Sequence, residues 1–123
     1  MDQVAITYEE VPEALLSAVP EFASAYQEHL ADNEGELLLH VLFGDLTRFA
    51  LDADENGDTE VIRRLLGFLD LSLREGDARV RNLVQVSFVE NVLPWTPTNN
   101  AFVRSWPEAL RVEAERQRDW RPS

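Results

Sequence analysis

The chain has 123 residues, no cysteine and a formal net charge of −12, which is the size of one typical domain. Without cysteine it can form no disulfide framework, thiolate zinc site or cysteine nucleophile. It has no apolar run near the roughly 20 residues of a membrane-spanning helix, and its first residues do not resemble a secretory signal, so we expect a cytoplasmic protein.

Two short helices are predicted at the start of the chain. The first begins near Thr7, because the spacing of Thr7 and Glu10 is that of a capping box. The second is predicted from Glu21 to about Asp32, where apolar side chains recur at helical spacing. The polar triplet Asn33-Glu34-Gly35 is expected to end it.

A central helix is predicted from Glu36 to about Leu51, because its first residues are apolar on every side. Gly44 inside this helix costs roughly 1 kcal/mol relative to alanine, so we expect a neighbouring helix to cross closely there. The segment Asp52–Asp58 is expected to be a polar loop.

This polar loop has the acidic spacing of the first half of an EF-hand calcium loop. The twelfth loop position falls on Arg63, where calcium needs a bidentate glutamate. A positive charge at that position opposes calcium binding, and acidic residues just before a helix suit its N-terminal dipole. We therefore interpret the loop as a polar turn and predict no metal site.

A helical hairpin is predicted next, from helices of about 59–74 and 78–93. Asp77 is expected to cap the second of these helices, and so short a turn makes the two antiparallel. The stretch Leu73–Leu83 resembles the turn of a HEAT-type repeat.

The last quarter of the chain begins with a stiff loop, Pro94–Thr98, which contains Trp95. A helical segment follows from about Asn99, with a break near Ser105, and the charged tail from Glu113 to Ser123 is expected to fray.

These elements predict an all-α fold with a single domain over residues 1–123, either a helical bundle or a short HEAT-like stack of five to seven helices. The chain has no Gly-x-Ser-x-Gly elbow, no His-Glu-x-x-His pair and no glycine-rich phosphate loop. We therefore predict no catalytic residue and no cofactor.

Two stretches, LLHVLFGDLTRF at 38–49 and VRNLVQVSFVEN at 80–91, resemble a family of small uncharacterised bacterial helical proteins. The resemblance implies an all-helical fold and supplies no activity. It turns attention to polar residues set among apolar ones, and Trp95 is added because tryptophan is enriched at interfaces. The candidate binding residues are His40, Asp45, Arg48, Asn82, Glu90, Asn91 and Trp95.

The alternative interpretation of these residues is structural. Asp45 and Arg48 are three residues apart and can pair on one helix, and the asparagines can bridge adjacent helices as part of an internal polar network. Trp95 would then be a hydrophobic plug over the bundle.

Charge is divided unevenly along the chain. Residues 1–60 hold 15 acidic residues against a single arginine, a net −14, whereas residues 61–123 hold 8 acidic residues and 10 arginines, a net +2. An acidic half repels nucleic acid and anionic lipid and attracts basic proteins. We therefore predict a basic protein partner and neither nucleic-acid nor membrane binding, with solubility as the alternative explanation of the charge.

The chain also resembles, in general type, the immunity proteins of bacterial toxin systems. This resemblance suggests a non-enzymatic protein-binding function, such as neutralising a basic toxin.

Two other functions stay open at this point. Glu36 and His40 are four residues apart and could line one helical face, with Asp45 farther along, as the start of a metal-dependent enzyme site. On the bundle interpretation His40 is instead partly buried and hydrogen-bonded to a neighbour, and His29 lies on the surface. The third possibility is a self-associating accessory domain, because the sequence does not determine the oligomeric state.

Overall fold

The computed structural model describes residues 6–92, 94 and 96–120, and these residues form an all-helical domain, which confirms the predicted fold class. The α-helices are α1 (Val11–Ala18), α2 (Ala23–Asp32), α3 (Leu39–Glu55), α4 (Thr59–Glu75), α5 (Ala78–Val84), α6 (Glu90–Val92), α7 (Asn100–Arg104) and α8 (Glu108–Trp120). A π-helical turn, Gln85–Val89, joins α5 to α6, so these three segments run as one helix.

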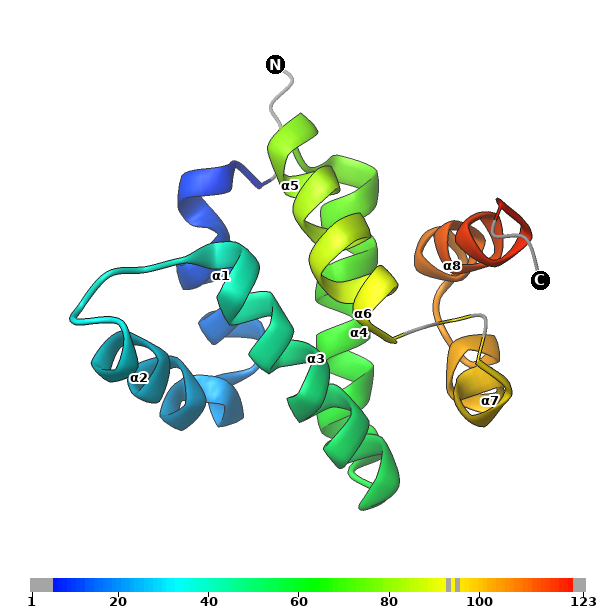
Figure 1. Cartoon of the computed structure of the whole chain (residues 1–123), viewed down its shortest axis with the longest axis horizontal. Helices are drawn as coiled ribbons and strands as arrows, with labels where there is room; N and C mark the ends of the chain where they lie inside the picture. The colour runs from blue at the N-terminus through cyan, green and yellow to red at the C-terminus, as the bar shows by residue number, and fades with distance from the viewer. Residues whose placement is uncertain (1–5, 93, 95, 121–123) are drawn as a thin grey trace.

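The centre of the molecule is made by α3, α4 and the continuous helix α5–α6 (Figure 1). Helices α1 and α2 lie on one side of this centre, and α7 and α8 lie on the other. Fully buried phenylalanine side chains from three parts of the chain meet in one core, at Phe22, Phe43 and Phe88. The chain therefore places its first two and its last two α-helices on opposite flanks of the central helices.

The hairpin between α4 and α5 forms as the sequence predicts. Asp77 caps α5, because its Oδ1 accepts the backbone N–H of Val80 at 2.9 Å. Its Oδ2 accepts the backbone N–H of Tyr8 at 3.2 Å, and a parallel bridge joins Ile6 to Gly76. The same aspartate thus starts the second helix of the hairpin and binds the backbone of Tyr8 near the start of the described chain.

Helix α3 is displaced from its predicted range at both ends. It begins at Leu39 rather than Glu36, because Glu34 and Gly35 adopt positive φ angles of 57° and 82° and delay the helix. It ends at Glu55, so the first four residues of the expected polar loop are helical. The prediction failed because Ala53 is buried in the core and holds this last turn in place.

The prediction of a close helix crossing at Gly44 is wrong. A Cβ atom at this position would meet only the side chain of Asn91, at 3.9 Å, which is an ordinary contact. The neighbouring helix lies where expected, but no backbone approaches closely.

The C-terminal segment breaks near Ser105 as predicted, but its tail differs from the prediction. Helix α8 continues through Glu113 to Trp120, and Leu110 and Ala114 are fully buried. The charged side chains of this segment misled the sequence interpretation, because apolar residues spaced four apart still place one face of α8 on the core.

Candidate functional site

Carboxylates of the first half of the chain gather between α2 and α3. They surround a cavity of about 380 Å³ whose lining includes Glu28 and Asp32 from α2 and Asp45 and Asp52 from α3. Arg48 also lines this cavity and pairs with Asp45, which leaves the other three carboxylates without a basic partner there. The spacings of four residues on α2 and seven on α3 place each pair on one helix face. The helix geometry therefore turns a linear excess of acidic residues into a local concentration of negative charge.

His29 lies in the wall of this cavity and is only 2% exposed, so the expectation of a surface histidine is wrong. Its Nε2 accepts the backbone N–H of Leu38 at 3.1 Å, which places the proton of the neutral ring on Nδ1. That Nδ1 lies 3.8 Å from the carboxylate of Asp45. The buried ring joins the loop before α3 to α2, and this role explains its burial.

A second group of carboxylates surrounds the end of α3 and the turn into α4. We use the name acidic surface for the exposed carboxylates of α2, of the last turns of α3 and of this turn. They are Glu28, Asp32, Asp52, Asp54, Glu55 and Asp58. Within the part of the chain that the structure describes, no basic side chain lies within 4.0 Å of these six carboxylates.

Few arginines of the second half reach the carboxylates of the first. Arg64 bonds Glu21 at 2.7 and 3.0 Å, and Arg79 lies 3.6 Å from Glu9. The hydrogen bond from Arg64 holds the pKa of Glu21 below its usual value. Glu60 is likewise held low, first by Arg63.

The other paired arginines of the second half find partners in their own half. Burial raises the pKa of Glu113, but hydrogen bonds from Arg116, Gln117 and Gln85 outweigh it and leave the pKa below the usual value. Arg74 pairs with Asp70 and Arg111 with Glu115. These arginines therefore pair with carboxylates of the second half and do not neutralise the acidic surface.

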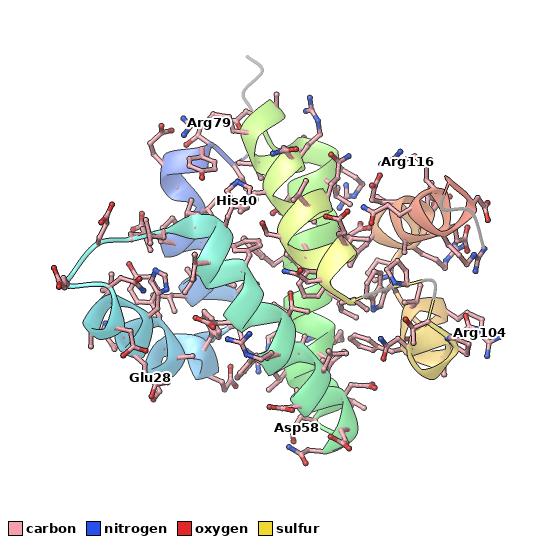
Figure 2. The ribbon with its side chains drawn as sticks, in the orientation of Figure 1. Glu28, His40, Asp58, Arg79, Arg104 and Arg116 are labelled. Carbon is pink, nitrogen blue, oxygen red and sulfur yellow. The ribbon has the colours of Figure 1, made fainter. Side chains whose placement is uncertain are left out.

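Figure 2 shows the resulting separation. Glu28 lies on the α2 side and Asp58 at the α3–α4 end, whereas Arg79 lies beside the start of α5. Arg104 and Arg116 lie on the α7–α8 side, away from the acidic surface.

The two motif stretches lie side by side, because α3 packs along the continuous helix α5–α6. His40 is exposed, but its Nδ1 bonds the hydroxyl of Ser87 at 2.5 Å, so the expected hydrogen bond is present and the expected burial is not. The carbonyl of Ser87 accepts a hydrogen bond from Nδ2 of Asn91 at 2.7 Å. The hydroxyl of Thr47 lies between two carbonyls, 2.8 Å from that of Phe43 and 3.2 Å from that of Ser87. These contacts hold the two helices in register.

The structure divides the candidate binding residues into separate places. Asp45 and Arg48 pair with each other beside α2, as the structural interpretation requires. His40 and Asn82 line a cavity of about 330 Å³ that also includes Tyr8 and Arg79, and the Arg79 guanidinium lies 3.8 Å above the Tyr8 ring.

Of the remaining three candidates, Asn91 bonds the carbonyl of Ser87. Glu90 is exposed on α6, and Trp95 lies outside the described residues. The six candidates within the described residues therefore do not form one site.

The metal-site alternative is not supported by the positions of its residues. Glu36 precedes α3, His40 contacts Ser87, and Asp45 contacts Arg48. Among the described residues, no three histidine, aspartate or glutamate side chains are grouped as metal ligands. The Ser87 hydroxyl is bonded to a histidine, but the residue is only 5% exposed and offers no accessible nucleophile.

The sequence interpretation missed one further cavity, of about 480 Å³, where the end of α3 and the start of α4 face the turn between α7 and α8. Its lining combines Asp54 and Asp58 with apolar side chains, among them Ile62 and Pro107. The acidic spacing was visible in the sequence, but no local signal brings Pro107 to it.

Comparisons with known proteins give one match. A family described as "Domain of unknown function (DUF7674)" matches residues 12–121, which include both motif stretches and the whole acidic surface. No curated protein and no solved structure matches the chain. None of the described helices is long and apolar enough to cross a membrane.

Proposed function

The chain belongs to the DUF7674 family of domains of unknown function, and we propose that it is a non-enzymatic protein that binds a basic protein partner through its acidic surface. The family description supplies no activity, so the proposal depends on the chemistry of this chain.

The observation that carries the proposal is the set of six exposed carboxylates with no basic neighbour within 4.0 Å among the described residues. Like charges on one surface repel one another and destabilise the free protein. A cationic partner would relieve that repulsion on binding, and the field of the acidic surface would speed its approach.

The narrower form of the proposal is an immunity protein that neutralises a basic toxin. Toxins that act on nucleic acid need a cationic surface to bind phosphates. A small acidic helical protein can cover such a surface by charge complementarity, with no chemistry of its own.

The test is affinity capture from the native cells at low salt with three baits. They are the wild type, the variant E28Q/D32N/D52N, and the control E13Q/E34Q/E36Q. The two variants remove the same charge, but Glu13, Glu34 and Glu36 lie outside the acidic surface. We expect the wild type and the control to retain one basic protein, and the surface variant to retain at least about tenfold less of it, because neutralising charges across an interface weakens binding.

The proposal fails if no basic protein is retained, or if the two variants retain it equally. The immunity form makes a further demand, which is that expression of the captured protein alone arrests growth and that co-expression of this chain restores it.

A further inference from the structure

The cavity of about 480 Å³ at the corner of α3 and α4 has an apolar floor. Ala53 and Leu66 are 5% and 3% exposed, so their side chains form part of the packed core beneath it. Ile62 and Pro107 are half-buried and complete the walls. A floor of this kind suits a stretch of methylene groups.

The rim of the cavity is negatively charged. Asp54 and Asp58 lie on it and are exposed. Arg63 also lines the cavity, but its guanidinium bonds both carboxylate oxygens of Glu60, at 2.6 and 3.1 Å. The charge of Arg63 is therefore compensated by Glu60, and the two aspartates remain available to a cation.

Two hydroxyl side chains, those of Thr59 and Ser105, also line the cavity. The hydroxyl of Ser105 donates to the backbone carbonyl of Phe102 at 2.7 Å. The cavity thus presents carboxylate acceptors above apolar walls.

We infer that this corner cavity is the anchor point at which the basic partner inserts an arginine side chain. The inference rests on the proposed function and names the group that the acidic surface recognises. The three methylenes of arginine would lie on Ile62, Leu66 and Pro107, and the guanidinium would bond Asp54 and Asp58. Planar, permanently charged guanidinium suits paired carboxylates better than an ammonium group does.

Other occupants fit the cavity less well. An apolar group would cover the aspartates without donating a hydrogen bond to them. An anion would be repelled by their charge. A bare cation would leave the apolar floor in contact with water. A second copy of this chain also carries arginines, but its net charge of −12 opposes self-association.

The experiment titrates two peptide probes into the isotopically labelled full chain at low salt, followed by NMR. One probe is hexa-arginine. The other is its homologue built from 2-amino-3-guanidinopropionic acid, which keeps the charge and shortens the methylene stem. We expect hexa-arginine to shift the resonances of Gly57, Ile62 and Leu66 and to bind more tightly than its homologue.

The variant D54N/D58N tests the two carboxylates, and asparagine is as well suited as aspartate to the N-cap position that Asp58 occupies at the start of α4. The control E34Q/E36Q removes the same charge from an exposed loop away from the cavity. We expect the dissociation constant for hexa-arginine to rise about tenfold in D54N/D58N, and about twofold or less in the control. Circular dichroism confirms that both variants fold.

The outcomes separate the inference from the proposed function. If hexa-arginine does not bind the wild type, both are overturned. If it binds but the two variants weaken it equally, the acidic surface stands and the anchor is overturned. Equal affinity for the shorter homologue, or a dimer detected by light scattering that D54N/D58N dissociates, also overturns the anchor.

Discussion

Single buried polar residues join helices that lie far apart in the sequence. Asp70 on α4 is 8% exposed, and its Oδ1 accepts the backbone N–H of Leu110 at 2.9 Å, in the first turn of α8. Its Oδ2 accepts the guanidinium of Arg74 at 3.0 Å. A carboxylate at this place satisfies one of the unpaired N–H groups of a helix start and suits its positive dipole end.

Replacing this carboxylate should therefore loosen α8. We expect Asp70→Ala to lower the free energy of unfolding by about 2–3 kcal/mol, because a buried N–H group and an arginine lose a charged partner. Asp70→Asn retains an acceptor for Leu110 and should lose less. Urea denaturation measures both.

The control for this prediction is Glu75→Ala, on the same helix, where the exposed side chain makes no ion pair within the described part of the chain. Its unfolding free energy should stay within about 0.5 kcal/mol of wild type. If Asp70→Ala unfolds at the wild-type urea concentration, the tie between α4 and α8 contributes nothing.

At the scale of elements, the turn between α4 and α5 depends on a glycine. A Cβ atom at Gly76 would overlap the carbonyl oxygen of Ser72 and would lie 2.6 Å from Cγ1 of Val80. Gly67, on α4, has no atom within 4 Å of the same added group. The two glycines therefore differ in what a methyl group would meet.

Alanine substitutions at these two positions should have opposite effects. Gly76→Ala should lower the free energy of unfolding by about 1–3 kcal/mol, because backbone and packed side chains must move. Gly67→Ala should raise it by about 0.5–1 kcal/mol, because alanine is the better residue in a helix. Urea titrations of the two variants decide this, and effects of the same sign would contradict the geometry.

At the scale of the whole molecule, the negative charge of the acidic surface lies on α2 and on the α3–α4 end. Helices α7 and α8 carry Arg104 and Arg116 (Figure 2), but together they hold four arginines and four acidic residues and so have no net charge. Repulsion among the carboxylates of the acidic surface lowers the stability of the free protein. Asp32 adds to it because a carboxylate in the last turn of a helix opposes the dipole.

The variant E28Q/D32N/D52N should therefore be more stable than wild type, although the proposed function predicts that it binds a basic partner less tightly. We expect a gain of about 0.5–1 kcal/mol at low salt. The gain should shrink at about 0.15 M salt, where the Debye length falls to about 8 Å.

Urea denaturation measures this gain without adding ions. The control E13Q/E34Q/E36Q should gain less, because Glu13 lies in the first turn of α1, where a carboxylate suits the helix dipole and its removal costs stability. Equal gains would mean that net charge, rather than the acidic surface, sets the stability.

The sequence by itself determined the features that arise within one or two helical turns. The repeat of apolar side chains predicted the all-helical fold, and the hairpin of α4 and α5 with its Asp77 cap formed as expected. The break near Ser105 and the pairing of Asp45 with Arg48 are also local. Each depends on groups at most four residues apart, whose geometry the helix itself dictates.

Only the tertiary structure decided which polar groups are buried and which distant groups meet. The burial of His29 depends on the N–H of Leu38, nine residues away, and the acceptor for Leu110 lies 40 residues earlier in the chain. The corner cavity likewise needs Pro107 to face Asp54. These contacts follow from the path of the backbone. Burial and long-range hydrogen bonding depend on where whole helices pack, and not on the neighbours of a residue in the sequence.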